Sequence, residues 1–414
     1  MYKNKPVLIY ILPRCPWPPF AGQARLAYFR AKELKKKGYK IILICFNKPN
    51  SIKQNNYLKL KKTFHEIHII PISSIDICLI AFRAMILRLR FNLPLQSSWL
   101  NSVNLIFEFK KRIIYLEKKY KKTFYHFYSI RSYSLWPIIE EYKKPFVIDL
   151  IDSMTLNLKR KCKISKNIKK YFWNYELIAS KNFEQNLPNF KFCKKYMVVS
   201  QLDKNNLKVN HDSTEESLYV SSIGYEIPEK LSKFENKEIQ NKNIIFFGSL
   251  SYEPNLKGII WLIKNVLPFV WEKDKNIFVN IAGSNPPKKL KNICKEYKQI
   301  TLIANPDSME ELIKKATIAV APLISGSGQQ FKIIESISHG IPVISTTKGA
   351  IPFNFKQNKE LIIADKPKEF AEAIFYLLKN PKKIEVLRNK AFLTIKNKFS
   401  WNNIVNQLEK DIYF

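Results

Sequence analysis

The stretch Thr317–Thr346, TIAVAPLISGSGQQFKIIESISHGIPVIST, decides the fold. It opens with an apolar run, Ile318–Leu323, that is short enough to predict a buried strand, and a second such run follows at Val343–Ser345. Between them, a glycine-containing loop leads into Gln329–His339, where apolar residues recur at helical spacing. Gly340 suits the left-handed conformation in which helices commonly end. Strand, loop, helix and strand predict one βαβ unit.

The loop and helix of this unit have the composition of an anion-binding site. Gly326 and Gly328 lack a Cβ, so backbone amides there can approach a ligand closely. The N-terminus of the following helix adds unpaired N–H groups and the positive end of the helix dipole. Farther along the helix, the Glu335 carboxylate can accept hydrogen bonds from sugar or ribose hydroxyls. The alternative is a doubly wound domain with an ordinary glycine loop and an ion-paired glutamate.

Length and composition predict a globular protein of two or three domains. The chain has 414 residues, of which 46% are hydrophobic and 13% aromatic, enough for sizeable cores. Its six cysteines are scattered, which argues against a zinc site or a disulfide framework and favours a reducing compartment. The first apolar run, Val7–Leu12, is too short for a signal-peptide core, and no apolar run reaches membrane-spanning length. We therefore expect a cytoplasmic protein.

The net charge of +36, from 70 Lys and Arg against 34 Asp and Glu, predicts attraction to polyanions. Anionic lipid, acidic substrates and nucleic acid are the candidate partners. The basic residues are spread over a chain rich in Lys, Asn and Ile, so a biased coding composition is an alternative explanation. We expect an anionic membrane surface, bound peripherally, to be the leading partner and nucleic acid the weaker one.

One predicted helix combines apolar and basic residues. In Cys78–Phe91, CLIAFRAMILRLRF, Arg83 and Arg90 are seven residues apart and share a face. Such a helix can lie in a membrane interface. The alternative is a core helix whose arginines extend to solvent. The charge of the whole chain favours the membrane slightly, whereas the basic run Lys159–Lys170 is by itself typical of a solvated helix face.

The first residues predict the opening of a doubly wound α/β domain. Lys5–Leu12 and Lys40–Phe46 are strands, separated by the loop Pro13–Gln23 and the helix Arg25–Lys37. Ligands of such domains bind beyond the carboxyl ends of the strands. Gly22 lies where the loop enters the helix, so it can present backbone N–H groups to a phosphate.

Two later strands end in polar residues. Phe124–Ile130 contains His126 and is followed by Arg131, at the strand end where a ligand-binding residue is expected. A single histidine inside an apolar strand is more often a core residue. Pro145–Ile151 is followed by Asp152, which contacts a ligand or, as the simpler interpretation, caps the next helix.

The second half repeats this organisation. Pro228–Asn243 is charged and aperiodic, which predicts a linker, and a new strand then runs from Asn243 to Gly248. The helix Asn255–Lys273 and the strand Asn276–Ala282, which ends at Gly283, follow. The predicted domains are 1–228, a linker 229–243, 244–398, and a terminal segment 399–414.

The opening stretch resembles the donor-site signature of family 4 retaining glycosyltransferases. That family typically carries two glutamates separated by seven residues, with the second on the nucleotide ribose. Glu335 matches the second, whereas Ser327 stands at the first. The chain resembles the branch with a Gly-Ser-Gly loop and a lysine before the glutamate. The matching residues are Ala321-Pro322-Leu323, Gly326-Ser327-Gly328, Lys332, Glu335 and Gly340-Ile341-Pro342-Val343.

Other family positions match in part. The loop Pro18–Gly22, with Arg25 beyond it, resembles the family's Pro-rich first loop, although Ala21 replaces its first glycine. In the second domain Gly248 is followed by Ser249, where the family usually has a diphosphate-binding arginine. Lys257 could supply the family's lysine, or it could be a surface lysine. Gly283 and the backbone near Asn305 match positions that flank the base, and His126 matches an acceptor-side histidine.

The resemblance implies two Rossmann-like domains facing a cleft, the GT-B architecture, with the last helix returning to the first domain. It implies a retaining hexosyltransferase that moves a sugar from a nucleotide-sugar to a glycan or lipid-linked glycan in capsule, exopolysaccharide or lipopolysaccharide synthesis. No metal or other cofactor is expected, and the leaving phosphate takes the acceptor proton. The expected site residues are Arg131 and His126 (catalytic), Asp152 and Arg25 (acceptor side), and Gly22, Gly248, Ser249, Lys257, Gly283, Gly326, Ser327, Gly328, Gln329, Lys332 and Glu335 (donor side).

Two other functions are compatible with parts of the sequence. A nucleotide-sugar epimerase of the same fold would need acid/base residues, for which only Asp152 and His126 are available. A basic nucleic-acid-binding protein would explain the charge and would bind with a steep salt dependence, but it leaves Glu335 and the glycine loop without a role.

Overall fold

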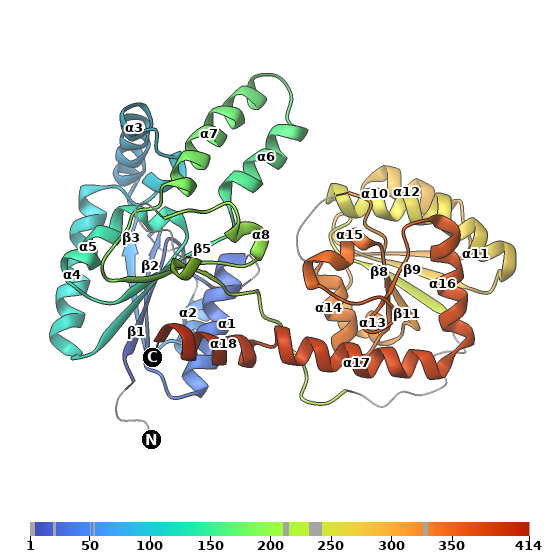
Figure 1. Cartoon of the computed structure of the whole chain (residues 1–414). Coiled ribbons are helices and arrows are strands. Elements are labelled where there is room, and N and C mark those ends of the chain that lie inside the picture. Colours follow the sequence, from blue (N-terminus) through green and yellow to red (C-terminus); the bar gives the residue numbers. More distant parts are fainter. Residues whose placement is uncertain are drawn as a thin grey trace. The chain divides into compact units, whose positions relative to one another are not determined.

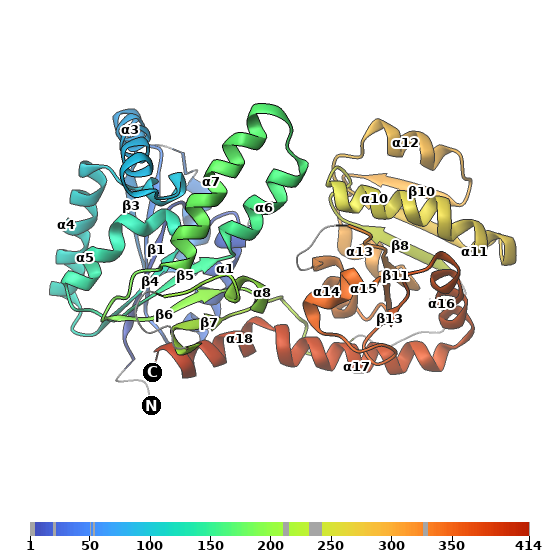
Figure 2. The same ribbon diagram turned by 45° about the horizontal axis from the view of Figure 1, so that its top comes forward.

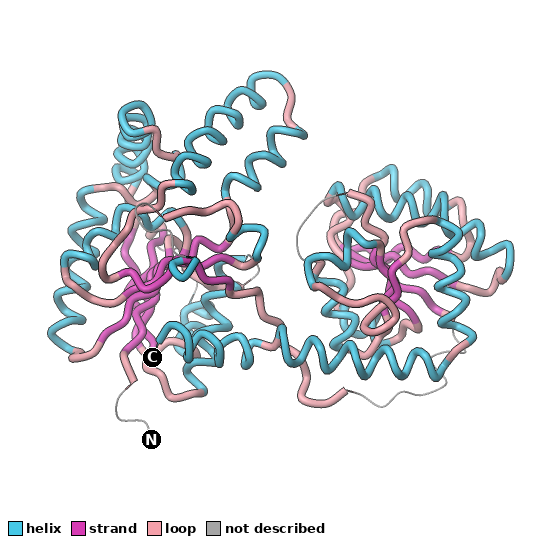
Figure 3. Tube along the Cα trace, viewed as in Figure 1, coloured by secondary structure: helices cyan, strands magenta, loops and turns pink. Residues whose placement is uncertain are grey.

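The computed structural model describes residues 5–19, 22–49, 51–52, 54–209, 215–231, 242–325 and 330–413. The chain forms two compact units, which Figure 1 shows coloured along the sequence. Unit 1 comprises Met1–Gly224 and Trp401–Phe414, and unit 2 comprises Tyr225–Ser400. Each unit has a parallel sheet surrounded by helices (Figure 3). The predicted α/β class with two doubly wound domains is confirmed.

Unit 1 has a seven-stranded sheet in the order β3-β2-β1-β4-β5-β6-β7. The strands are β1 (Val7–Leu12), β2 (Ile41–Asn47), β3 (Glu66–Pro71), β4 (Thr123–Tyr128), β5 (Phe146–Ile151), β6 (Cys193–Val198) and β7 (Leu218–Val220). The helices are α1 (Gly22–Lys36), α2 (Gln54–Lys61), α3 (Ser74–Phe91), α4 (Val103–Lys119), α5 (Trp136–Glu141), α6 (Met154–Ile164), α7 (Asn167–Gln185), α8 (Gln201–Lys204) and α18 (Trp401–Leu408).

Unit 2 has a six-stranded sheet in the order β10-β9-β8-β11-β12-β13. The strands are β8 (Asn243–Phe247), β9 (Phe278–Gly283), β10 (Ile300–Ala304), β11 (Ile318–Ala321), β12 (Val343–Ser345) and β13 (Ile362–Ile363). The helices are α10 (Glu253–Trp261), α11 (Leu267–Lys273), α12 (Lys288–Lys295), α13 (Met309–Lys314), α14 (Phe331–Ser338), α15 (Thr347–Ala350), α16 (Pro367–Lys379) and α17 (Pro381–Phe399). Within the described ranges of the chain, no helix is both long and apolar enough to cross a membrane.

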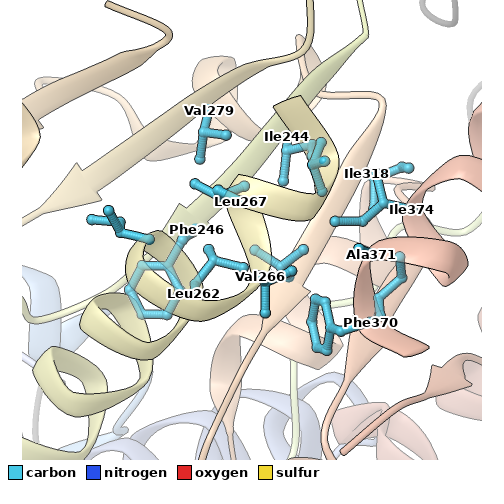
Figure 4. Packing of buried hydrophobic residues seen from close by; sticks show 14 of the residues in the cluster. Ile244, Phe246, Leu262, Val266, Leu267, Val279, Ile318, Phe370, Ala371 and Ile374 are labelled. Atoms are coloured by element: carbon cyan, nitrogen blue, oxygen red, sulfur yellow. The ribbon is translucent and has the colours of Figure 1, made fainter. Parts of the chain in front are cut away.

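The central strand β8 shows why the strands are continuous apolar runs. Ile244 and Phe246 pack in one cluster with the helical segment 262–267 and with α16 (Figure 4). Ile245 and Phe247 point to the opposite face and pack in a second cluster that includes residues of α14 and α17. Because helices cover both faces of the sheet, neither set of alternating side chains meets water, and the strand needs no polar residue.

The segment after residue 400 completes the core of unit 1. The Trp401 ring stacks on Phe29 of α1 with 5.5 Å between centroids. A Cβ on Gly224 would lie 2.3 Å from the Trp401 ring, so the backbone must be glycine there. Farther on, the Tyr413 hydroxyl lies 2.6 Å from His126 Nδ1 inside the sheet's helical cover.

A buried ion pair and a hydrogen bond connect α1 to β5 and to the residue that follows β7. The Arg30 guanidinium contacts the Asp149 carboxylate of β5, and both side chains are almost completely shielded from solvent. Arg30 Nη2 also donates to Ser221 Oγ at 2.8 Å, just beyond β7. Burial raises the pKa of Asp149, but the Arg30 charge outweighs it and holds the pKa below its ordinary value.

One predicted helix differs from the structure. The predicted continuous helix Asn255–Lys273 is interrupted by the π-helical segment Leu262–Val266. Pro268 follows it and has no N–H for the carbonyl four residues earlier, so the backbone shifts to a wider turn. Most of the predicted linker 229–243 lies outside the described residues. Other predicted elements differ from the observed ones at their ends.

We predict that Arg30→Met lowers the free energy of unfolding by about 3–5 kcal/mol, because it leaves the Asp149 carboxylate buried without its cation. Urea denaturation at neutral pH measures this. The difference from the wild type should shrink as the pH falls, because Asp149 without its cation takes up a proton in the folded variant at a higher pH than the paired Asp149 of the wild type. Lys36→Met, on the exposed side of α1, is the control, and an equal effect of both substitutions would contradict the role of the pair.

Candidate functional site

In each unit the order of the strands reverses direction at one place, which we call the switch point. In unit 2 the chain leaves β8 for β9 on one side and later enters β11 on the other side of β8. In unit 1 the same change of direction occurs at β1, between β2 and β4. At such points the loops that follow the two neighbouring strands separate at the carboxyl edge, and ligands of doubly wound sheets bind there.

The switch point of unit 2 is built on two glycines. Gly248 ends β8 with φ +137° and Gly283 ends β9 with φ +155°. A Cβ on Gly283 would lie 1.7 Å from the Gly248 carbonyl oxygen, so only glycine permits this approach of the two backbones. Ser249 follows, and its carbonyl accepts a hydrogen bond from Asn255 Nδ2 at 2.9 Å. The predicted donor-side residues Gly248, Ser249 and Gly283 are therefore brought together.

Lys332 lies beneath the β8–α10 loop as a buried cation. Its Nζ donates to Asn255 Oδ1 at 2.8 Å and lies 3.9 Å from the centre of the Phe246 ring. The side chain is 7% exposed, and burial lowers its pKa to about 7. Among the residues that the structure describes, no carboxylate forms an ion pair with Lys332. A buried ammonium without a counter-ion, in the first turn of α14, favours an anion at this point.

Glu335 lies three residues after Lys332 in the same helix, so the two side chains are neighbours on the α14 surface. Glu335 is partly exposed, and the helix continues to Ser338, whose hydroxyl donates to the Glu335 carbonyl at 2.8 Å. The predicted donor residues Gly326, Ser327, Gly328 and Gln329 lie outside the described residues. The described part of this site is therefore formed by β8, β9, α14 and the loops next to them.

Lys257 is not brought to the switch point. It lies on the exposed side of α10, where its Nζ is 2.7 Å from the Glu253 carboxylate one turn earlier. More than half of each side chain is exposed, so the pair contributes little to stability. The structure therefore agrees with the interpretation of Lys257 as a surface lysine. Among the described residues, Lys332 is the cation at the switch point of unit 2.

The switch point of unit 1 carries two arginines and a tryptophan. Arg14 follows β1 and Arg131 follows β4, and their guanidinium carbons lie 5.0 Å and 5.1 Å from the centre of the Trp99 ring. Burial and the neighbouring Arg14 lower the pKa of Arg131. In the described part of the chain neither arginine forms an ion pair with a carboxylate. Two like charges held together in this way favour an anionic ligand.

A pocket of about 480 Å³ opens at the same edge of the sheet. Its described lining combines apolar side chains from β2, α3 and the loops around them with two cations and no acid. Such a lining fits a ligand with an apolar body and a negative group. The residues that give it this character are Phe46, Ile72, Ile77, Ile80 and Trp99 (apolar) and Arg14 and Lys48 (cationic).

The other predicted residues of unit 1 divide into buried and peripheral ones. His126 is completely buried, as the core interpretation predicts, and burial lowers its pKa to about 4. Of the two interpretations of Asp152, the helix cap is wrong, because Ser153 is the N-cap of α6 and its Oγ accepts the bond from Leu156 N. The acceptor-side role of Asp152 stays a prediction. Asp152 accepts a hydrogen bond from Asn157 Nδ2 at 2.7 Å.

Gly22 and Arg25 lie at the start of α1. Gly22 is its first residue, and nothing lies within 4 Å of a Cβ placed there, so no close backbone contact of the described residues requires glycine. The Arg25 guanidinium lies over the Phe29 ring at 5.3 Å. Sequence reasoning missed Arg14, Trp99 and Asn255. For Arg14 a signal existed, since it follows the first strand as Arg131 follows β4.

No group of three or more His, Cys, Asp or Glu side chains in the described ranges is arranged to hold a metal ion. Each switch point carries positive charge, from Lys332 in one unit and from Arg14 and Arg131 in the other, and Glu335 adds a carboxylate in unit 2. The lysine and the two arginines can bind anions, and the Glu335 carboxylate can orient hydroxyl groups.

Comparison with known proteins agrees with this geometry. Residues 241–380, which contain Gly248, Gly283, Lys332 and Glu335, match the family model described as Glycosyl transferases group 1. An uncharacterized 44.6 kDa protein in the cps region of Klebsiella pneumoniae is 26% identical over 253 residues. That match covers 59% of this chain and spans 62% of the length of the relative.

Two solved structures share the fold over almost the whole chain. HepE of Anabaena in complex with UDP has a TM-score of 0.60 at 12% identity, with 98% of each chain covered. A glycosyltransferase from Rickettsia africae has a TM-score of 0.60 at 15% identity, with 99% of this chain and 98% of that chain covered. HepE has also been solved with UDP-glucose. The predicted GT-B fold is confirmed by these similarities.

We predict that Lys332→Met changes the pH dependence of stability. Because folding lowers the pKa of Lys332 to about 7, the unfolded chain binds one more proton between this value and the ordinary lysine pKa of about 10.4. The stability of the wild type relative to the variant should therefore increase between about pH 7 and about pH 9.5. Urea denaturation at both pH values measures this, with the exposed Lys257→Met as the control. A difference that does not change with pH would contradict the buried cation.

Proposed function

We propose that the chain is a retaining glycosyltransferase that transfers a sugar from a nucleotide-sugar to a hydroxyl acceptor during surface polysaccharide synthesis. The matched family model supports the transferase class, and the relative encoded in a cps region supports the polysaccharide. The donor binds to unit 2 at the β8/β11 switch point. The acceptor binds to unit 1 at the β1/β4 switch point.

The observation that carries the proposal is the buried Lys332. A cation that is 7% exposed and has no carboxylate partner among the described residues is unfavourable in the empty protein. A nucleoside diphosphate supplies the missing negative charge. The ammonium lies against the β8–α10 loop through Asn255, so a diphosphate that binds at Gly248 and at the N-terminus of α14 is within its reach.

We propose a uridine diphosphate sugar as the donor. HepE, whose fold is similar, was solved with UDP and with UDP-glucose. In this chain Glu335 binds the ribose hydroxyls, while Gly283 and Asn305 lie beside the base. Asn305 N donates to the Gly283 carbonyl at 2.8 Å, and Asn285 N donates to Asn305 Oδ1 at 3.2 Å, which fixes the two loops against each other.

The reaction balances without a side-chain nucleophile. The acceptor hydroxyl oxygen forms a bond to the anomeric carbon, and the bond from that carbon to the diphosphate oxygen breaks on the same face of the sugar. The acceptor proton passes to the departing diphosphate. Lys332 and the N–H groups at the start of α14 stabilise the charge that develops on the diphosphate, so we expect no metal requirement.

On the acceptor side, Arg131 and Arg14 bind a negative group of the acceptor, and the apolar pocket binds its hydrophobic part. A lipid-linked glycan has both parts, because a diphosphate joins its sugar to a hydrocarbon chain. The complete burial of His126 argues against the epimerase alternative, which would use this histidine as an acid or base.

We predict that UDP raises the melting temperature of the purified protein and that the shift persists in EDTA. A panel of UDP, GDP and ADP followed by thermal denaturation, with and without magnesium, measures this. Lys332→Met should lose most of the shift because it removes the cation for the diphosphate. Absence of a shift with every nucleotide, together with salt-dependent RNA binding, would replace the proposal by a nucleic-acid function.

We also predict that Glu335→Ala raises the KM for the donor by on the order of tenfold to a hundredfold, because two hydrogen bonds from the ribose to a carboxylate are lost. Steady-state kinetics with the donor identified by the panel measures it. Glu372→Ala, an exposed glutamate on α16 of the same unit, is the control and should leave KM unchanged. A folded Glu335→Ala variant with wild-type KM would remove this residue from the site.

A further inference from the structure

Helix α3 has its polarity reversed relative to an ordinary surface helix. Its buried residues are Asp76, Ala84 and Arg88, of which two are charged. Large apolar side chains lie on the outside, for example Phe82, which is 59% exposed, and Leu89, which is 74% exposed. A surface helix normally presents its apolar stripe to the core and its charges to water. The core interpretation of this helix is therefore wrong for most of its apolar residues.

Polar contacts hold α3 in this orientation. Asp76 forms a capping box with Ser73 and accepts a hydrogen bond from Ser102 Oγ at 2.5 Å. Near the other end, Arg88 Nε lies 3.1 Å from Glu176 Oε1 of α7, and its guanidinium lies 3.6 Å from the centre of the Tyr175 ring. Because both charged residues are satisfied inside the unit, the helix has no freedom to turn its apolar side inward.

The neighbouring hairpin of α6 and α7 extends the exposed apolar area. Figures 1 and 2 both show α3 and α7 at the same end of unit 1, and the ion pair between Arg88 and Glu176 joins them. On α7, Ile168 is 84% exposed, Tyr171 77% and Ile178 63%. We call the outer sides of α3, α6 and α7 together the α3–α7 surface.

The charges of the α3–α7 surface are sorted by sign. The acids of the three helices, Asp76, Glu176 and Glu184, are all buried. Apart from Arg88, the basic residues are partly or fully exposed. The α3–α7 surface thus combines large apolar side chains with cations, and its helices show no exposed carboxylate. Such a surface is complementary to an apolar layer with a negatively charged face. The basic residues are Arg83, Arg90, Lys159, Arg160, Lys161, Lys163, Lys166, Lys169, Lys170 and Lys181.

We propose that the α3–α7 surface binds to the interface of a lipid bilayer that contains anionic lipid. The apolar side chains enter the boundary between headgroups and acyl chains, and the lysines and arginines contact lipid phosphates. A second copy of the same surface is a poor occupant, because two cationic faces without exposed acids repel each other. This binding does not depend on the proposed activity, since none of these side chains belongs to the donor site.

The position of the pocket gives the proposal a consequence for the acceptor. Ile77 and Ile80 of α3 line the pocket of unit 1, so the helix that contacts the lipid also forms a wall of that pocket. A lipid-linked acceptor could then enter the pocket without leaving the bilayer interface. This second step rests on the proposed function, whereas bilayer binding itself does not.

The test is flotation of the full-length protein with vesicles of phosphatidylcholine alone and of an equimolar mixture with phosphatidylglycerol. We expect binding to the mixed vesicles, weakened by salt. The variant Phe82→Gln, Met85→Gln and Leu89→Gln should weaken this binding on the order of tenfold or more, because it removes one apolar stripe and keeps the charge. Glutamine retains good helix propensity. The matched control, Tyr376→Gln, Val386→Gln and Leu393→Gln, changes exposed apolar residues of unit 2 and should bind like the wild type.

Three results would overturn the proposal. They are absence of binding to the mixed vesicles, equal binding by the wild type and the α3 variant, and a dimer in sedimentation analysis that the α3 variant alone abolishes. The UDP-induced thermal shift, measured on every variant, reports that unit 2 is folded. The shift also distinguishes bilayer binding from the proposed function. Loss of bilayer binding with a retained shift would contradict only the bilayer proposal, and loss of the shift with retained binding would contradict only the proposed donor site.

Discussion

A parallel sheet has to be covered on both faces, because every connection between its strands crosses over one face. This constraint makes the central strands of both units, such as β1, β2, β8 and β11, largely apolar and buried. Chemistry is confined to the loops at the carboxyl edge, and within that edge to the place where the strand order reverses. Lys332 and Glu335 of unit 2, and Arg14 and Arg131 of unit 1, lie in or beside the loops that follow strands at these places.

At these places lie cations that none of the described acids neutralises. In unit 1 a buried arginine is neutralised inside the fold, because Arg30 is paired with Asp149. Lys332 has only an amide oxygen and an aromatic face as described partners. The contrast separates a structural charge from a binding charge. The first is satisfied in the folded chain, whereas we propose that the second is satisfied only by a bound ligand, at the expense of stability.

The fold was predictable because apolar runs, helical spacing and glycine positions are local in the sequence. Glu335 was singled out from its position in the predicted helix, whereas Gly248, Gly283 and Lys332 were predicted as site residues from the resemblance to the family. Trp99 and Asn255 did not, because each reaches its partner only through the tertiary fold. Lys257 matches the family's lysine only with a longer spacing, and its side chain lies on the exposed side of α10. The sequence of α3 did not predict which side faces inward, because its buried charged residues, Asp76 and Arg88, find their partners only in the tertiary fold. The loop 326–329 lies outside the described residues.

The core of unit 1 contains residues from both sides of unit 2 in the sequence. Trp401 stacks on Phe29 above Gly224, and Tyr413 reaches His126 in β4. A ribosome therefore completes unit 2 before it has made the last helix that unit 1 requires. Domains usually fold in the order of their synthesis. Here the first unit to emerge is the last to be finished, and until then its aromatic core around Phe29 and Tyr10 stays open to water and to chaperones.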